Sequence, residues 1–337
     1  MILPLLQLLM ALLVIVAAAE CFTNALENLG DRLGISEGVT GSLFAAVGTA
    51  LPETVVPLLA LAAGSGNSAV NQDVATGAIL GAPLMLATLT IFLMASAAVP
   101  RRGLAARLRP EPGGLVRDLH FFLAAFTLAA LGLALPEESS GVRLALALLL
   151  VGLYAVYVTL TVRASAGLVA QGHGTDAWSA PWLVRLGLPD HGAVVALQLV
   201  LGTLLLLGGA QAFIDSVEQV SHRFGFPALL LSLIVIPVAT ELPEKVNSVL
   251  WIRRGKDTLA FANITGAMVF QGTLLPAIGI VLTPWRARPE VLAGMAVTLF
   301  AALWLRVLCR RNGVPLAGLL LNGLLYAAYL AAALLLI

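Results

Sequence analysis

Apolar runs of about 18 residues or more recur along the whole chain, and each is long enough to cross a hydrocarbon core of roughly 30 Å as a helix. The 337 residues are 60% hydrophobic and only 11% charged, whereas soluble domains are about 25% charged. The runs are continuous and lack the alternation of transmembrane barrels. The sequence therefore predicts an all-α polytopic membrane protein. Its expected spans, about ten in number, are residues 3–28, 38–63, 74–99, 118–136, 142–163, 192–218, 226–252, 258–283, 289–308 and 314–336.

Basic residues are distributed unevenly between the two sides of such a bundle. The connections on one side carry fourteen Arg and Lys residues and those on the other carry four, while Lys245 lies within a span. Cytoplasmic loops carry this excess, so we predict an integral protein of a bacterial-type plasma (inner) membrane with both termini on the non-cytoplasmic side. As orientation signals the basic runs require no nucleic acid. Contact with anionic lipids of the bilayer stays open.

Two segments of the chain resemble each other. Residues 19–53 align without a gap with residues 210–244. Shared Ala, Leu and Val mean little among apolar segments, but shared Arg, Gly, Pro and Glu indicate copies of one internal repeat. The identical pairs are Ala19/Ala210, Phe22/Phe213, Glu27/Glu218, Arg32/Arg223, Gly34/Gly225, Val47/Val238, Thr49/Thr240, Leu51/Leu242, Pro52/Pro243 and Glu53/Glu244.

The expected spans divide as five plus five, and an odd number of spans per copy places the second copy upside down in the membrane. The basic residues agree, since Arg32 falls on the cytoplasmic side and its counterpart Arg223 on the other. We expect a first five-helix repeat in residues 1–163, a cytoplasmic linker in 164–191 and a second, inverted five-helix repeat in 192–337. Inverted repeats with breaks at corresponding positions are typical of secondary transporters, whose substrate lies near the midplane between the repeats.

Each copy places the tripeptide Leu-Pro-Glu inside an apolar run. Pro52 and Pro243 cannot donate to the carbonyl four residues back, so each frees carbonyl oxygens in a span. Such backbone is tolerated at depth only where protein buries it or it lines a wet cavity. Glu53 and Glu244 follow directly. A charge at the bilayer centre costs about 2.5–3.5 kcal/mol on the gentler scales, so an intramembrane carboxylate indicates a functional site.

The matching positions would bring these groups together across a pseudo-twofold axis. The hydroxyls of Thr49 and Thr240, three residues before each proline, add two oxygens. Two carboxylates, two hydroxyls and freed carbonyls form a hard, negatively charged cage that suits Ca²⁺ or Na⁺ and not a soft metal. One Leu-Pro-Glu alone could merely kink a helix, but two at corresponding positions favour an ion site formed by Glu53 and Glu244.

The second copy carries additional charge. Glu241 lies three residues before Glu244 and four before Lys245, so Glu241 and Lys245 can pair on one helix face. Two interpretations of Lys245 stay open. It is either a counter-ion that makes the carboxylates tolerable, or an ammonium that permanently occupies a site which a transported monovalent cation would otherwise fill.

These residues resemble a signature of the calcium/cation antiporter superfamily, in particular its sodium/calcium exchanger branch. Gly-Thr-Ala-Leu-Pro-Glu ends at Glu53 and Ala-Thr-Glu-Leu-Pro-Glu ends at Glu244, close to the family's Gly-(Thr/Ser)-Ser-Leu-Pro-Glu in the second helix of each inverted repeat. The resemblance covers essentially the entire chain. It implies that Glu53 and Glu244 are the central ion-binding carboxylates, and that Thr49 and Thr240 supply backbone or hydroxyl ligands.

The chain also departs from the family pattern. Positions where the family has Ser carry Ala or Glu, and the Gly-Ser-Asn type signature of the third helix survives only in part. The departing positions are Ala50 and Glu241 in the first signature, and Ala82, Ala267, Leu86 and Gln271 in the second. The resemblance therefore implies fewer ligands at the flanking sodium sites, with Glu241 and Gln271 as remaining candidates.

We interpret the chain as a secondary active cation antiporter that exchanges Ca²⁺, or a related cation, for Na⁺ or H⁺ by alternating access. Its partners would be inorganic cations and the lipid bilayer. It would need no cofactor beyond the transported ions, and no P-loop is present. Because the driving ion and the substrate would share Glu53 and Glu244, their occupancies would exclude each other and couple the two flows.

Three alternatives remain open at this stage. The first is proton coupling without sodium sites, with Glu241 and Lys245 as the titrating partners. The second is a non-transporting regulatory relative. The third is an intramembrane enzyme, which is disfavoured because no His-Glu-x-x-His motif occurs and no histidine stands beside a nucleophile in an apolar span.

Overall fold

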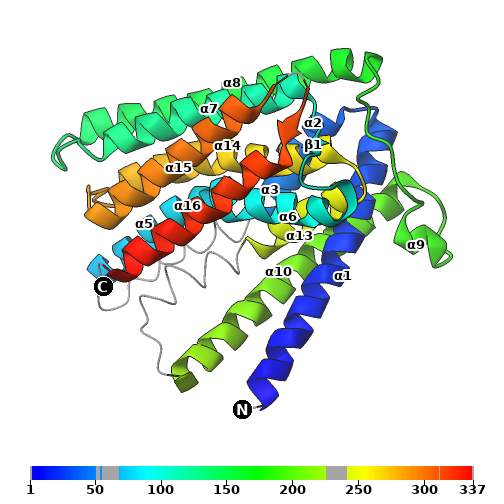
Figure 1. Ribbon diagram of the computed structural model, residues 1–337, viewed down its shortest axis with the longest axis horizontal. Helices are drawn as coiled ribbons and strands as arrows, with labels where there is room; N and C mark the ends of the chain where they lie inside the picture. The colour runs from blue at the N-terminus through cyan, green and yellow to red at the C-terminus, as the bar shows by residue number, and fades with distance from the viewer. Residues whose placement is uncertain (1, 51–53, 55–67, 225–240, 311, 336–337) are drawn as a thin grey trace.

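The computed structural model describes residues 2–50, 54, 68–224, 241–310 and 312–335, and the described chain is almost entirely helical (Figure 1). The long helices are α1 (Ile2–Leu33), α5 (Ser68–Met85), α6 (Ile91–Arg102), α7 (Pro112–Gly132), α8 (Ser140–Ala170), α10 (Gly192–Phe224), α13 (Leu242–Arg253), α14 (Asp257–Leu282), α15 (Pro289–Leu308) and α16 (Leu316–Leu335). The short elements are α2 (Glu37–Val39), α3 (Ala46–Thr49), α9 (Trp182–Arg185), the π-helical turns η1 (Thr40–Ala45) and η2 (Leu86–Thr90), and the paired strands β1 (Arg107–Leu108) and β2 (Val314–Pro315).

Within these residues, seven helices are long and apolar enough to cross a membrane. Those regions are Leu9–Leu33, Ala75–Arg102, Pro112–Gly132, Ser140–Ala170, Gly192–Gly209, Asp257–Leu282 and Pro289–Leu308. Helix α8 leaves many apolar side chains uncovered, among them Leu144 and Leu148, as expected of a surface that faces lipid tails. The sequence-based expectation of a helical membrane protein is thus confirmed.

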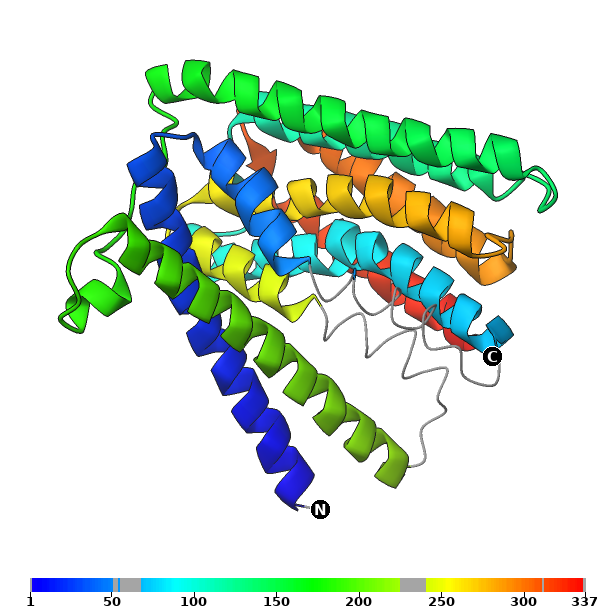
Figure 2. The ribbon, with the colours of Figure 1, turned by 180° about the vertical axis from the view of Figure 1, so that it is seen from behind.

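Helices α1 and α10 form an antiparallel pair that extends away from the other helices (Figures 1 and 2). Their contact depends on small residues, because a Cβ on Gly202 would lie 3.0 Å from the backbone of Phe22. Small residues at helix interfaces allow the close backbone approach on which association in lipid depends. The pair joins two helices whose sequences correspond in the internal repeat.

Helix α14 is the most covered of the membrane-spanning helices and lies between α7, α8, α13 and η1. Its approach to η1 is very close, because a Cβ on Gly266 would come within 2.4 Å of the Ser42 backbone. The π-helical turn η1 widens the helix at this point, and such turns are frequent at functional sites. This packing fixes the start of the segment that leads toward the first Leu-Pro-Glu.

The end of α14 is closed by a residue from a distant helix. Arg143 on α8 is buried and donates to the carbonyls of Ile280, Thr283 and Pro284. Carbonyls in the last turn of a helix lack partners within it, and a cation there also meets the negative end of the helix dipole. Arg143 is one of the four basic residues counted on the less basic side of the predicted bundle. The structure gives it a specific capping role.

The linker expected at residues 164–191 is shorter and more firmly packed than its composition indicates. Helix α8 continues to Ala170, because apolar residues with helical preference follow the expected end of the span at 163. The rest is tied to α1: Asn28 donates its side-chain amide to the Ser179 carbonyl at 2.9 Å, and the Trp178 amide donates to Glu27 at 3.0 Å.

Candidate functional site

The candidate site forms around the start of α13. Glu241 occupies the N-cap position of this helix without a side-chain capping bond, and Pro243 lies in the first turn, where the missing amide hydrogen is not needed for the helical ladder. The Lys245 amide donates to the Glu241 carbonyl at 3.2 Å and so closes the first turn. The second Leu-Pro-Glu therefore begins a helix, which sets its acidic side chains at the helix's positive end.

Three ionisable side chains of this first turn are buried together. Glu241 and Glu244 are 0% exposed and Lys245 is 3% exposed. The Lys245 Nζ atom lies 3.5 Å from Glu241 Oε2, so the pairing inferred from the spacing of four residues is confirmed. Buried charges are retained only where partners or bound ions compensate them. Among the described residues, this first turn carries two carboxylates and one ammonium, a composition that suits a cation site.

Polar side chains from neighbouring helices lie close to Glu241. The side chain of Gln271 on α14 lies close to that of Glu241. Neither of its amide atoms makes a hydrogen bond of standard geometry to another described residue. Tyr326 on α16 is also close to Glu241. In the described part of the chain, its hydroxyl lacks a hydrogen bond, and so do both side-chain amide atoms of Asn247 on α13. Buried polar groups are normally paired, so this arrangement suits a hydrated or bare cation.

Asn263 on α14 holds the site helix in place. Its side-chain amide donates to the Ser248 hydroxyl at 2.9 Å and to the Glu244 carbonyl at 3.3 Å. The contact fixes α13 against α14, which carries Gln271.

The structure describes five of the site residues predicted in the second copy. Pro243, Glu244, Glu241, Lys245 and Gln271 lie within the described residues, and all are buried. The remaining predicted residues are not tested by it. Pro52, Glu53 and Thr240 fall outside the described residues, and Thr49 ends α3 without a described side chain.

At three positions where the chain departs from the family signature, the structure places a buried apolar side chain. Ala82 and Ala267 are buried within α5 and α14, and Leu86 is buried at the start of η2. These side chains carry no oxygen, so they cannot ligate a cation. Across the described residues, no group of three or more His, Cys, Asp and Glu side chains is spaced to hold a metal. Within the described residues, the candidate site is a small cluster on α13 and α14, with Tyr326 of α16 beside it.

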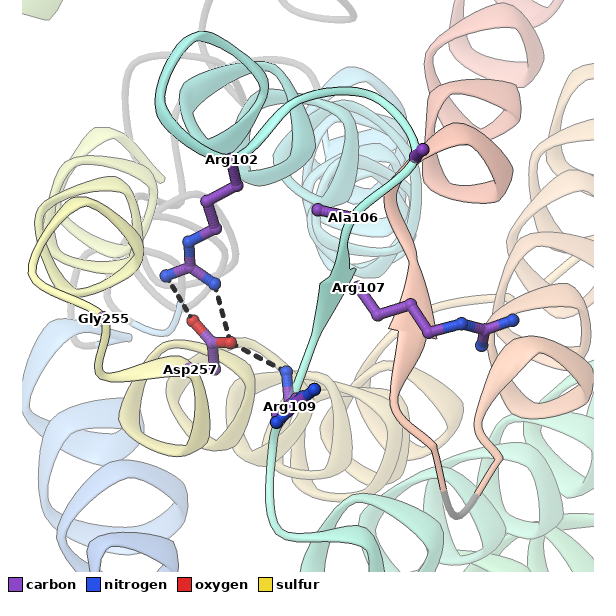
Figure 3. A pocket seen from close by; sticks show the side chains of 7 residues that line it. Arg102, Ala106, Arg107, Arg109, Gly255 and Asp257 are labelled. Atoms are coloured by element: carbon purple, nitrogen blue, oxygen red, sulfur yellow. Dashed lines mark hydrogen bonds and ion pairs between the residues drawn. The ribbon is translucent and has the colours of Figure 1, made fainter.

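A separate pocket of about 690 Å³ lies at the end of α6 (Figure 3). Arg102 forms two 2.8 Å bonds with Asp257, which also accepts from the Arg109 amide at 2.7 Å. Arg107 and Arg109 line the same pocket. Its arginines outnumber its single carboxylate, so this pocket repels cations and is not a second candidate for the ion site.

A buried polar network beside η1 was missed by the sequence analysis. Asp118 on α7 accepts from Ser42 at 2.9 Å, from Thr265 at 2.7 Å and from Tyr157 at 3.1 Å. The four residues come from four elements that are far apart in the chain, so no spacing pattern reveals them. The one available signal was an aspartate at the edge of the expected span 118–136.

Comparison with known proteins identifies the family. The sequence profile described as "Sodium/calcium exchanger protein" matches residues 3–163 and 194–335. The chain is 26% identical over 327 residues to "Inner membrane protein YrbG" of Escherichia coli (strain K12), covering 94% of this chain and 92% of that protein. It is 26% identical over 276 residues to "Putative antiporter CaxA" of Alkalimonas amylolytica, covering 82% and 80%.

Solved structures show the same fold. A structure of the sodium-calcium exchanger NCX_Mj soaked with Na⁺ and Sr²⁺ superposes with a TM-score of 0.73 at 17% identity and covers 98% of both chains. The fold is therefore that of a helical membrane exchanger. Because the profile matches nearly the whole chain, the protein belongs to the sodium/calcium exchanger family.

Proposed function

We propose that this protein is a secondary active antiporter that exchanges Ca²⁺, or a related cation, for Na⁺ or H⁺. The observation that carries the proposal is the buried cluster at the start of α13. Glu241 and Glu244 are fully buried there, and Gln271 and Tyr326, both close to Glu241, have side-chain polar groups without a hydrogen bond among the described residues. Carboxylate, amide and hydroxyl oxygens are the ligands that Ca²⁺ and Na⁺ prefer. Family membership supports cation exchange.

The internal repeat supplies the second half of the proposed site. Glu53 aligns with Glu244 in a matching Leu-Pro-Glu, and in the proposed arrangement of inverted repeats, residues 1–163 and 192–337, the two glutamates meet near the membrane midplane. Thr49 and Thr240 would add oxygens at the same level. A driving ion bound to these carboxylates excludes the substrate ion, which couples the two flows.

The residues of the candidate site support H⁺ rather than Na⁺ as the coupling ion. The buried side chains at Ala82, Ala267 and Leu86 carry no oxygen, so three positions where the family signature offers ligands cannot hold Na⁺. Carboxylates can bind protons without any further ligand. We therefore propose Ca²⁺/H⁺ exchange as the first choice and Na⁺ coupling as the second.

Proteoliposomes test both levels of the proposal. Uptake of radiolabelled Ca²⁺ is measured with an imposed H⁺, Na⁺ or K⁺ gradient, each alone. We expect uptake driven by a pH gradient in sodium-free buffer. Strict dependence on a Na⁺ gradient would overturn proton coupling but retain antiport. A protein that moves no cation under any gradient would refute antiport itself.

A further inference from the structure

The two copies of the Leu-Pro-Glu signature differ in charge on one helix face. In the first copy, Ala50 is buried and the Thr54 hydroxyl donates to the Ala50 carbonyl at 2.9 Å, so this face is neutral and closed on itself. In the second copy the aligned residues are Glu241 and Lys245. The second copy thus carries a carboxylate and an ammonium that the first copy lacks.

The geometry of the pair leaves the carboxylate open. The distance of 3.5 Å from Lys245 Nζ to Glu241 Oε2 exceeds the roughly 2.7–2.9 Å of a charge-assisted hydrogen bond. Neither Glu241 oxygen has a hydrogen-bond partner within the described part of the chain, and neither does the neighbouring Gln271 amide. The ammonium therefore provides charge near Glu241 without saturating its oxygens.

The electrostatics of the first turn favour a positive charge at this place. Glu241 and Glu244 lie three residues apart on one helix and are both fully buried, where like charges repel strongly and burial disfavours ionisation. A free monovalent cation held by Glu241 would relieve this repulsion. A tethered ammonium relieves it permanently, because it cannot dissociate.

We propose that the Lys245 ammonium occupies the place of one monovalent cation beside Glu241, so that the ion-binding cluster takes up no free monovalent ion there. The inference rests on the proposed function in that the cluster is the ion site. It makes Lys245 a residue that determines which ions the protein uses: the transported cation remains on the other carboxylates, and one monovalent position is filled by the chain itself.

Removal of the ammonium should open that position to a free ion. In purified Lys245→Met, Glu241 loses its fixed partner and becomes a vacant monovalent site. The test measures the thermal midpoint of unfolding in detergent as NaCl replaces choline chloride at constant ionic strength. A ligand that binds only the folded state raises the midpoint, so we expect the Na⁺-dependent rise to be larger in Lys245→Met than in wild type by about 2 °C or more.

A double variant assigns the effect to Glu241. Glu241→Gln/Lys245→Met lacks both charges, and we expect its Na⁺-dependent rise to return to the wild-type value. If Lys245→Met does not fold, Lys245→Gln carries the same test, because its amide is neutral and similar in length. Equal Na⁺ dependence in wild type and the single variant would overturn the inference, and so would an increase that persists in the double variant.

The readout separates this inference from the proposed function. Binding in detergent does not depend on transport, so an absent Na⁺ effect would leave antiport by the wild-type protein untouched. Conversely, a wild-type protein that moves no cation in proteoliposomes would refute antiport, while the gain of Na⁺ binding in Lys245→Met would still establish the tethered cation.

Discussion

Glu244 is the residue on which the proposed ion site depends most directly. It is fully buried in the first turn of α13, so a neutral side chain of the same size should leave the fold intact and remove the charge that binds a cation. Contacts to a charged group contribute about 1.5–3 kcal/mol. We therefore expect Glu244→Gln to lower the initial rate of Ca²⁺ uptake in proteoliposomes by about tenfold to a hundredfold.

Glu138 offers a matched control for that substitution. It lies exposed in the turn between α7 and α8, so Glu138→Gln makes the same chemical change away from the cluster. We expect uptake by this variant to equal that of wild type. Normal uptake by Glu244→Gln would show that the buried carboxylate does not bind the transported ion.

The substitution Asp118→Asn tests whether the buried hydrogen-bond network around Asp118 stabilises η1. Its three donors, Ser42, Thr265 and Tyr157, lose a shared charged acceptor in Asp118→Asn, and unsatisfied buried donors cost about 1–3 kcal/mol. We expect a lower thermal midpoint for Asp118→Asn in detergent. Tyr157→Phe removes only the 3.1 Å bond and should have a smaller effect. Equal midpoints for Asp118→Asn and wild type would exclude a structural role for the network.

The sequence predicts contacts of the site between residues close together in the chain, but not contacts between helices far apart in the chain. The Glu241–Lys245 pair follows from a spacing of four residues on one helix, and the structure confirms it at 3.5 Å. The positions of Tyr326 near Glu241 and of Tyr157 against Asp118 depend on how helices far apart in the chain pack together. No local pattern records such contacts, so sequence reasoning could not supply them.

At the scale of elements, the close contact between α14 and η1 can be tested by substitution. Because a Cβ on Gly266 would lie 2.4 Å from the Ser42 backbone, Gly266→Ala must push the two elements apart. Inserting one methyl into a packed interface costs about 1–3 kcal/mol. We expect a lower thermal midpoint and reduced Ca²⁺ uptake, since η1 leads toward the first Leu-Pro-Glu.

Gly152 provides the control at this scale. It lies in the middle of α8, and a Cβ there would meet no atom within 4 Å. Gly152→Ala should be neutral or slightly stabilising, because Ala favours helix over Gly by about 1 kcal/mol. If both alanine variants behave alike, close packing at Gly266 does not limit the fold.

Element boundaries were predictable where polar residues interrupt the apolar runs. The span expected at 289–308 coincides with α15, and that expected at 258–283 agrees with α14 (Asp257–Leu282) within one residue. The span expected at 3–28 ended too early, because α1 continues to Leu33. Its last turns carry Glu27, which is buried and paired across the fold, and a hydropathy argument treats such a charge as the end of a span.

At the scale of the whole molecule, the distribution of basic residues predicts sidedness. Fourteen Arg and Lys residues lie in or near the connections on one side, so both termini should face away from the cytoplasm. A protease-cleavable tag after the C-terminus should be removed when protease is added to intact spheroplasts. The same tag inserted after Gly172, in the connection that follows α8, should be protected. The reverse pattern would invert the orientation.

The α1–α10 pair is joined to the other helices near one end by a cluster of charges. Glu27 on α1 is fully buried and forms ion pairs with Lys256 at 3.1 Å and Arg254 at 3.5 Å, both in the connection between α13 and α14. It also accepts from the Trp251 indole at 2.9 Å. If alternating access moves this pair relative to the site on α13, these bonds must open in one of the two states.

Glu27→Gln should weaken this attachment, because a neutral amide cannot form the two ion pairs. Loss of charge-assisted bonds costs about 1.5 kcal/mol or more, and we expect hydrogen exchange of residues 254–256 to accelerate about tenfold. Arg32→Gln is the control, since it breaks an exposed ion pair with Asp190 at the same end of α1. Exchange at 254–256 that is unchanged in Glu27→Gln, or equally accelerated in Arg32→Gln, would show that the buried charges do not hold the α1–α10 pair to the helices that carry the site.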